Sequence, residues 1–463
     1  MRKVKHRIYG DGKILKSRYG GAEVFVEFES GISRWIKDMD LDHGEFINKI
    51  LKREKPDVKL NSQESRQNFV DKTKERFESK PFDNITNQAR ANIEALRMGL
   101  FPDNNIEDFT FGRKKEKEFI QNWLHNSNEG SLIMTGVYGV GKTHFLEYIN
   151  NVALKDNWAV SFLEFDSNSL PLNKPKLLYQ EIIRSFKYKN GNFKDFMNEV
   201  AKSSNYILMK EHAHLSRMIK RIRDDTDYDY CWDWIHGRLN HSGKSVYLPP
   251  IYTYSTAANI FCYILSGIGF AAKEVLGLNG FIIFFDEAEN IDPYWYSSYQ
   301  RAKGWNFLEG LILMTSNSRD LLQDEPFNEV NVSNRKSNEL RGRLTNLQYY
   351  NKLPYQYLWK TPCSVRIVMG FTPYETLLSK KPLNQLSRLE LHKLDPKALQ
   401  EIATEITTFY YQAYNYQTDK ERSQLPSELL KNYDATRLYI KSLVEILDLT
   451  RFHPKKPLDE LLQ

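Results

Sequence analysis

The sequence predicts a multidomain α/β protein. Its central domain is expected to hold a parallel sheet, with a small β-barrel before it and a helical segment after it. Three observations predict this class. Strand-like and helix-like segments alternate from about residue 106, short alternating runs separated by glycines occupy residues 1–45, and amphipathic helical segments follow residue 385. Alternation of strand and helix favours a parallel sheet, because a helical crossover carries the chain back to the start of the next strand.

Length and composition limit the number of domains, the kinds of partner and the location that we expect. A chain of 463 residues exceeds one ordinary core, so we expect about two to four domains. The formal net charge of +6 permits nucleic-acid binding without arguing for it. Three widely separated cysteines form no CxxC pair, and the N-terminus leads into no apolar signal segment. A cytoplasmic location without membrane association is therefore expected.

Residues 1–45 predict a small antiparallel barrel. Their short runs at 13–16, 22–28 and 33–36 alternate apolar and polar residues, and glycines separate them. Residues 46–105 predict a linker and then a helical segment at 86–100, which Pro102 ends.

Residues 106–385 predict the α/β core, with a polar, aromatic insertion at about 187–255 and a second polar insertion at about 323–362. The expected strands are at 131–135, 159–165, 281–285 and 365–370, and the expected helices are at 115–124, 143–154, 256–276 and about 295–322. Residues 386–463 predict helices that would form a lid.

A complete phosphate-binding motif of the form GxxxxGK[ST] occupies residues 136–143 (GVYGVGKT). An apolar strand precedes it and an apolar helix face follows it, which is the context that distinguishes the motif from a chance glycine turn. The glycines allow successive backbone N–H groups to face one anion, and the helix N-terminus adds to that field. We therefore expect ATP and Mg²⁺ to bind at Gly136, Val137, Tyr138, Gly139, Val140, Gly141, Lys142 and Thr143. Lys142 would contact phosphate, and the Thr143 hydroxyl would ligate magnesium.

Two acids follow a strand that is apolar throughout. Residues 281–285 (FIIFF) predict a central strand buried on both faces, and Asp286 and Glu287 stand at its end. Asp286 is expected to face the magnesium ion, and Glu287 to polarise the attacking water. The competing interpretation is an acidic cap on the next helix.

Three further features fit an AAA+-like ATPase. Gly112 and Arg113, before the phosphate-loop strand, resemble the segment that contacts adenine in origin-recognition-type ATPases. Thr372 ends a strand where a sensor-1 residue would meet the γ-phosphate, and Arg437 opens a helix where a sensor-2 arginine would reach the nucleotide. A surface turn, a turn threonine before proline and a solvated helix-end charge are the respective alternatives. Arg341, Arg343 and Arg388 are candidate arginine fingers.

The combined motifs resemble the BrxC/BrxD-type ATPases of BREX phage-exclusion systems, from about residue 85 to the C-terminus. The segments that carry the resemblance are ANIEALRMG at 91–99, FGR at 111–113, YGVGKTHFL at 138–146 and DEAE at 286–289. The third segment adds His144 to the residues of the nucleotide loop. The layout is closest to the shorter BrxD-like members. The resemblance implies an AAA+-like (ASCE) fold, ATP hydrolysis and action on DNA beside a helicase or another defence protein. The two insertions carry no motif of that family.

The N-terminal segment resembles the Tudor/SH3-like domain of UvrD-type helicases. The resemblance rests on VKHRIYGDGKI at 4–14 and VFVEF at 24–28. Such domains dock proteins such as RNA polymerase or contact nucleic acid.

Two basic clusters are candidate phosphate contacts. The first twenty residues hold seven lysines and arginines against one acid, Asp11, which fits either a nucleic-acid face or a solvated barrel surface. The second cluster contains Lys210, Arg217, Lys220, Arg221 and Arg223 on a predicted helix. Because Asp224, Asp225, Asp227 and Asp229 follow at once, internal ion pairing is the favoured interpretation of the second cluster.

The function predicted from these features is an ATP-hydrolysing AAA+-like protein that acts on DNA in antiphage defence, as a homo-oligomer. Two alternatives stay open. One is a STAND-like switch that binds ATP tightly and turns it over slowly, and the other is an adaptor whose barrel recruits a partner while ATP only stabilises the fold.

Overall fold

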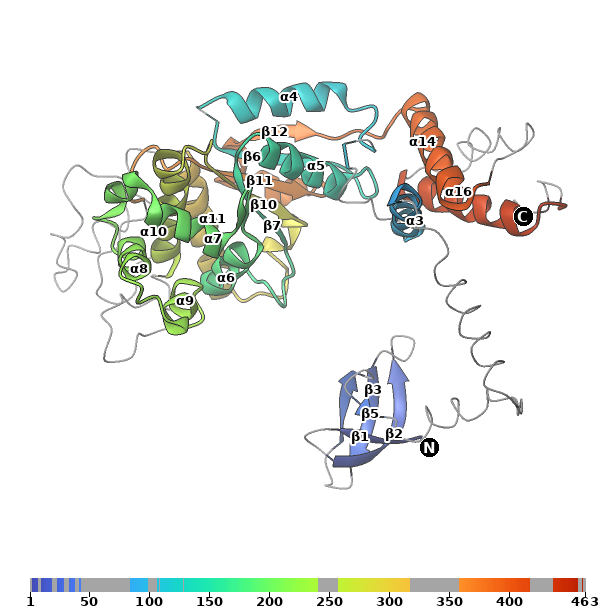
Figure 1. Cartoon of the computed structure of the whole chain (residues 1–463), viewed down its shortest axis with the longest axis horizontal. Coiled ribbons are helices and arrows are strands. Elements are labelled where there is room, and N and C mark those ends of the chain that lie inside the picture. The colour runs from blue at the N-terminus through green and yellow to red at the C-terminus, as the bar shows by residue number, and fades with distance from the viewer. Residues whose placement is uncertain are drawn as a thin grey trace, which may run out of the picture. The chain divides into compact units, whose positions relative to one another are not determined.

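The computed structural model describes residues 2–6, 10–18, 23–28, 33–37, 41–42, 84–98, 106–107, 109–127, 129–239, 257–316, 358–416, 436–456 and 460. The chain divides into two compact units, Met1–Phe82 and Asp83–Gln463. Figure 1 draws both. Arg341 and Arg343 lie outside the described residues.

The first unit contains one antiparallel sheet. Its strands are β1 (Arg2–His6), β2 (Gly10–Arg18), β3 (Glu23–Phe28), β4 (Ser33–Lys37) and β5 (Leu41–Asp42), in the spatial order β4-β3-β2-β1-β5. The expected short strands are therefore present. Their assignment to a Tudor/SH3-like barrel stays a prediction, as does the phosphate-contacting role of the basic residues that they carry.

The second unit is built around a seven-stranded sheet with the order β12-β6-β11-β10-β7-β8-β9. The strands are β6 (Ser131–Thr135), β7 (Ala159–Glu164), β8 (Lys187–Tyr188), β9 (Gly191–Asn192), β10 (Phe281–Asp286), β11 (Val365–Phe371) and β12 (Ser387–Glu390). All neighbouring pairs from β12 to β7 are parallel. The strand β11 lies between the phosphate-loop strand β6 and the acidic strand β10. The predicted α/β fold with a parallel sheet is confirmed.

Helices cover both faces of this sheet (Figure 1). On one face α4 (Lys114–His125) and α5 (Lys142–Lys155) bury an apolar cluster against Leu132, Ile282, Phe284 and Val368. The alternate residues of the same strands, including Ile133, Ile283 and Phe285, face the second cluster. That cluster also receives α6 (Pro175–Ser185), α10 (Ala257–Phe270), η5 (Ala271–Val275) and α11 (Ser298–Thr315). The continuous apolar run of β10 follows from this burial on both faces.

The first insertion packs into the core. It contains α7 (Phe193–Lys202), η4 (Ser204–Met209), α8 (Leu215–Arg223) and α9 (Asp229–Ile235). The Asn192 side chain and Asp195 form a capping box that starts α7. Phe196, Met209, Met218 and Trp234 are buried in the same cluster as the sheet. The segment expected to be a polar, aromatic insertion thus supplies aromatic residues to the core. Nearly all of the second insertion lies outside the described residues.

The C-terminal region holds two long helices and a strand that the sequence analysis missed. The helices α14 (Pro396–Tyr414) and α16 (Thr436–Phe452) pack with α3 (Asn84–Arg97), so the helix predicted in the linker region joins the lid. The missed strand is β12, which pairs with β6 at the edge of the sheet. At only four residues, with a single buried position, it carries too little apolar pattern to be recognised.

Gly112 lies in the segment that connects α3, which packs with the lid helices, to α4 of the core. Gly112 has a φ of +65°, and a Cβ atom at this position would lie 2.5 Å from the Cβ of Ala398 on α14. Only glycine fits both this backbone and this close approach. In the part of the chain that the structure describes, no helix is long and apolar enough to cross a membrane.

Candidate nucleotide site

The phosphate loop joins the end of β6 to the start of α5. Gly141, the residue before α5, has a φ of 97°, a left-handed conformation that explains the requirement for glycine there. The backbone N–H of Gly136 donates to the carbonyl of Phe371 on β11 at 3.2 Å, which ties the loop to the neighbouring strand. Lys142 Nζ donates to the Gly136 carbonyl at 2.9 Å, so the ammonium group lies over the loop.

The acidic strand end meets the loop directly. The Thr143 hydroxyl donates a 2.6 Å hydrogen bond to Oδ2 of Asp286, whose carboxylate is only 4% exposed. The other oxygen, Oδ1, accepts from the backbone N–H of Glu287 at 2.9 Å. A hydroxyl beside a carboxylate is the hard oxygen donor set that magnesium prefers, so the expected metal residues fit that ion.

Glu287 has an exposed side chain and a left-handed backbone, with a φ of 51°. Such a conformation is strained for a residue other than glycine, and strain of this kind is concentrated at functional sites. Although the residue is largely exposed, partial desolvation of its carboxylate, followed by the nearby carboxylates of Glu164, Asp286 and Glu289, raises the pKa of Glu287, while Lys142 opposes this shift. A raised pKa makes this carboxylate a stronger base than an ordinary glutamate.

Lys142 is affected in the opposite direction. Burial lowers the pKa of its ammonium group, and the three acids Glu289, Asp286 and Glu287 act against that decrease. The site therefore holds a partly desolvated cation among carboxylates, which is an environment that favours binding of a phosphate together with a metal ion.

Thr372 and Arg437 lie at the same cavity as the phosphate loop. The cavity encloses about 420 Å³ and is bordered by the loop, α5, the end of β10, the end of β11 and the first turns of α16. Thr372, Arg437, His144, Asp286 and Glu287 all line it. Five positions spread over almost 300 residues of sequence thus meet at one pocket.

Four lining residues were missed by the sequence analysis: Glu147, Glu289, Thr436 and Ile440. Glu289 has a defined contact, because its Oε2 accepts the backbone N–H of Thr372 at 3.1 Å and so joins β11 to the segment after β10. Glu147 lies four residues after Thr143 on α5, and that helical spacing was a usable signal. Thr436 and Ile440 carried no comparable signal.

Arg113 lies outside this cavity, although the sequence places it in the nucleotide-binding set. Its buried guanidinium donates to the Val140 carbonyl at 2.9 Å and to Glu116 at 3.0 Å. Gly112 and Arg113 line a second cavity of about 670 Å³, on the side of α4. Arg113 therefore braces the phosphate loop from behind in this structure, and contact with adenine stays a prediction.

His144 is held behind the loop as well as lining the cavity. The Thr110 hydroxyl donates to the Ile106 carbonyl at 2.6 Å and lies 2.9 Å from Nε2 of His144, so it accepts the ring N–H. Burial of the ring, followed by the cations Arg113 and Lys117, lowers the pKa of His144 to about 3. The imidazole is neutral at physiological pH.

Of the three arginine-finger candidates, Arg388 lies within the described residues, on β12. Its Nη2 donates to the Leu378 carbonyl at 2.8 Å, a contact within its own subunit.

Comparison with known proteins gives one family match. Residues 85–202 match the model of the BREX system ATP-binding protein BrxC/D, so the resemblance predicted from the motifs is confirmed over that segment. A search of curated proteins gave no match.

Solved structures with a similar arrangement include DnaA from Aquifex aeolicus bound to AMPPCP, with 13% identity and a TM-score of 0.32 over 75% of this chain and 66% of that one. A DNA replication initiation factor has the same identity and TM-score over 75% of this chain and 65% of that one. Replication initiator DnaA bound to AMPPCP and single-stranded DNA has 12% identity and a TM-score of 0.31, over 74% and 63%. The chain spans slightly less than two thirds of the length of each.

Proposed function

We propose, from the BrxC/D match over residues 85–202 and the cavity at the phosphate loop, that this protein binds ATP with Mg²⁺ and hydrolyses it to ADP and phosphate. The observation that carries the proposal is the convergence of Lys142, Thr143, Asp286 and Glu287 on one cavity that Thr372 and Arg437 also line. A phosphate loop alone supports binding. The added carboxylate with a raised pKa supports hydrolysis.

Each side chain has a defined task in this proposal. The loop N–H groups and Lys142 hold the β- and γ-phosphates, and Thr143 with Asp286 holds the metal, which when bound neutralises charge on the phosphate oxygens. Glu287 accepts the proton of the attacking water at its carboxylate. Thr372 contacts the γ-phosphate. Arg437 reaches the nucleotide from the lid, so that α16 responds to its presence.

The biological setting of the proposal follows the BREX resemblance. The protein acts in the cytoplasm on DNA or DNA-bound complexes in antiphage defence, as a homo-oligomer with a helicase or another defence protein as partner. The N-terminal sheet is the proposed docking module. The arginine finger is supplied by a neighbouring subunit, with Arg341 and Arg343 as candidates beside Arg388.

The decisive experiment is ATP hydrolysis by the purified full chain, with and without single- and double-stranded DNA, measured in parallel with Glu287→Gln and Lys142→Ala. Glu287→Gln keeps nucleotide binding and loses turnover by at least about 100-fold, as expected for removal of a general base. Lys142→Ala loses binding. Normal turnover by Glu287→Gln would falsify the role of this carboxylate. Slow turnover that DNA does not stimulate would favour the switch or the adaptor.

A further inference from the structure

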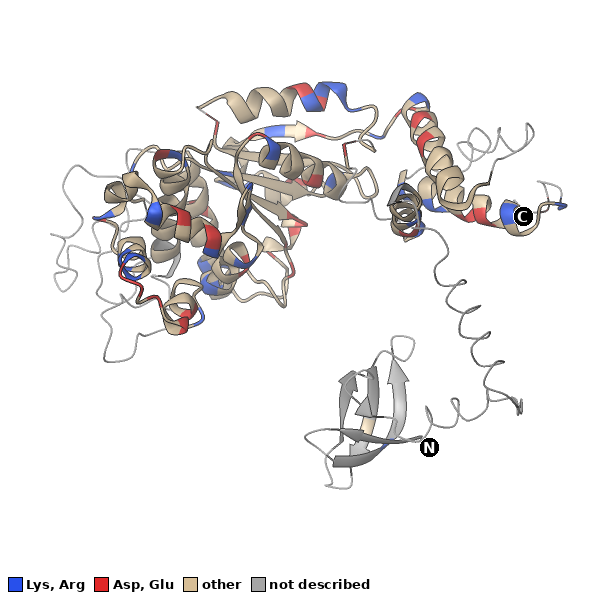
Figure 2. Cartoon of the chain, viewed as in Figure 1, with Lys and Arg blue, Asp and Glu red and all other residues tan. Residues whose placement is uncertain are grey.

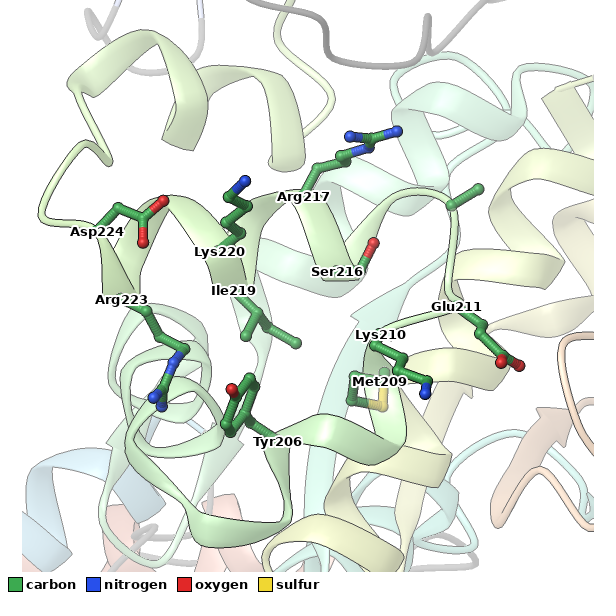
Figure 3. Close-up of a pocket in the computed structure, with 11 residues that line it drawn as sticks. Tyr206, Met209, Lys210, Glu211, Ser216, Arg217, Ile219, Lys220, Arg223 and Asp224 are labelled. Carbon is green, nitrogen blue, oxygen red and sulfur yellow. The ribbon is translucent and has the colours of Figure 1, made fainter.

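A second cavity, separate from the nucleotide site, lies between η4 and α8. It encloses about 540 Å³. Figure 3 shows Ile219 of α8 and Tyr206 of η4 facing each other across this space. Met209 and Ile219 are buried, so the inner wall is part of the hydrophobic core and is held rigidly.

Basic side chains predominate among the charged residues that line this cavity. Lys210, Arg217, Lys220 and Arg223 line it, against the two acids Glu211 and Asp224. In Figure 2 the acidic residues that follow α8 continue along the loop that leaves the helix. The cavity itself therefore retains a positive charge of two.

Arg223 is part of the wall. Its guanidinium carbon lies 3.7 Å from the centre of the Tyr206 ring, and Nη1 donates to the Ala201 carbonyl at 2.6 Å. The stacked pair joins α8 to α7 and η4. This arrangement fixes the aromatic ring that borders the cavity.

The other three cations are exposed. No ion pair within 4.0 Å joins Lys210, Arg217 or Lys220 to an acid among the described residues, and none joins Arg221 or Arg223. The internal ion pairing favoured by the sequence is therefore not observed. One of the expected acidic partners, Asp227, accepts instead from Nε1 of Trp232 at 3.1 Å.

We propose that this cavity binds the phosphate backbone of a nucleic-acid strand, and we refer to Lys210, Arg217 and Lys220 as the phosphate triad. The proposal rests on the DNA-acting part of the proposed function and names a site for it. Arg217 and Lys220 are three residues apart on α8 and project from the same side of that helix, whereas Lys210 extends from the end of η4 (Figure 3). The three cationic groups extend from different points of the cavity wall and do not point toward one another (Figure 3), a spread that fits an extended polyanion better than one small anion.

The aromatic ring at the cavity favours a nucleic acid over an acidic peptide. Tyr206 is partly exposed and lines the cavity, and proteins that bind single strands combine a basic groove with aromatic side chains on which bases stack. The next two residues of η4, Ile207 and Leu208, are 49% and 41% exposed and add apolar surface. Ser216 adds a hydroxyl of the kind that contacts phosphate oxygens.

The test compares three full-length proteins in a salt series, with a fluorescein-labelled thymidine oligonucleotide and a labelled duplex as probes. The first is the wild type. The second is the triad variant, a triple variant that combines Lys210→Gln, Arg217→Gln and Lys220→Gln. The third, a charge-matched control, is Lys187→Gln, Lys189→Gln, Lys273→Gln, which removes three exposed lysines that do not line the cavity. Thermal melting of each protein confirms that the fold is kept.

The triad variant is expected to bind the oligonucleotide at least about tenfold more weakly, with a salt slope reduced by about 2, because each lost phosphate contact removes about 0.7 from the slope for a single strand. The control keeps both values, and DNA-independent ATP hydrolysis is unchanged in both variants.

Equal oligonucleotide affinity of the triad variant and the wild type would overturn this site and leave the proposed ATPase untouched. A wild type that binds neither probe would remove the DNA part of the proposed function together with this inference. Binding of a polyglutamate peptide that depends on the triad, without binding of the oligonucleotide, would assign the cavity to an acidic protein partner and overturn the nucleic-acid assignment.

Discussion

The hydroxyl of Thr143 donates a 2.6 Å hydrogen bond to Oδ2 of Asp286, across 143 positions of sequence. This bond joins the first turn of α5 to the end of β10, the two elements that supply the expected metal donors. Since β11 separates β6 from β10 in the sheet, the loops that follow these two strands meet above the end of β11. The bond therefore places the two expected donors side by side.

Thr143→Val tests this junction. Valine keeps the shape but removes the donor, so Asp286 loses a hydrogen bond worth about 1–3 kcal/mol of unfolding free energy, as measured by urea unfolding of the nucleotide-free protein. ATP turnover is expected to fall by about 100-fold or more, because an oxygen ligand of the proposed metal ion is lost. Thr143→Ser retains the hydroxyl and should retain most of both properties. Equal turnover by the valine and serine variants would contradict the assignment.

The raised pKa of Glu287 predicts a pH dependence. A general base must be deprotonated, so kcat/KM falls as the pH decreases through the pKa of this carboxyl. Because Glu164 is the first charged neighbour that raises this pKa, Glu164→Gln removes a repelling charge and lowers it. The acid limb of the kcat/KM profile therefore moves to lower pH in this variant. Glu401→Gln, at an exposed position on α14, is the control. If the acid limb of the kcat/KM profile of Glu164→Gln moved to higher pH or stayed fixed, Glu287 would be excluded as the titrating group.

The sequence predicted the nucleotide site and the order of the main elements, because both depend on local patterns. The phosphate loop is a contiguous motif, and β10 is a continuous apolar run ended by two acids. The contribution of Glu289 depends on a contact with Thr372 across 83 positions, which no local pattern contains. The same limit explains the missed strand β12 and the buried aromatic residues of the first insertion. The sequence predicts that Arg113 contacts adenine, whereas its bond to the loop carbonyl of Val140 became apparent only in three dimensions.

Arg113 is expected to act through the phosphate loop. Arg113→Ala removes the donor to Val140 and leaves Glu116 without its partner in a largely buried position, which costs about 3–5 kcal/mol of unfolding free energy. The KM for ATP rises, because the loop loses its brace, while kcat changes less. Lys115→Ala, at an exposed position on the same helix, should leave both unchanged. Urea unfolding measures the loss of stability, and steady-state kinetics measure the KM for ATP. An Arg113→Ala protein with a normal unfolding curve but no selectivity for adenine would instead favour direct contact between Arg113 and the base.

The lid is fastened to α3 by a charged network around Asp448. Arg97 Nε and Nη2 donate to the two carboxylate oxygens at 2.9 and 3.0 Å, and the Tyr410 hydroxyl donates to Oδ1 at 2.6 Å. The hydrogen bonds from Arg97 to Asp448, followed by one to Glu94, raise the pKa of Arg97. Arg97 belongs to the EALR segment that contributed to the BREX resemblance. The structure gives that segment a physical role, namely attachment of the helix after residue 83 to α14 and α16.

Breaking this network is expected to affect both stability and nucleotide binding. Arg97→Met and Asp448→Asn should each destabilise the protein, and a double-mutant cycle should give a coupling energy of about 1.5–3 kcal/mol, typical of hydrogen bonds between charged groups. Because Asp448 and Arg437 share α16, and Arg437 lines the nucleotide cavity, a loosened lid should also raise the KM for ATP. Glu445→Gln removes an exposed charge from the same helix and serves as the control. A coupling energy near zero with an unchanged KM would show that apolar packing among α3, α14 and α16 holds the lid without help from this network.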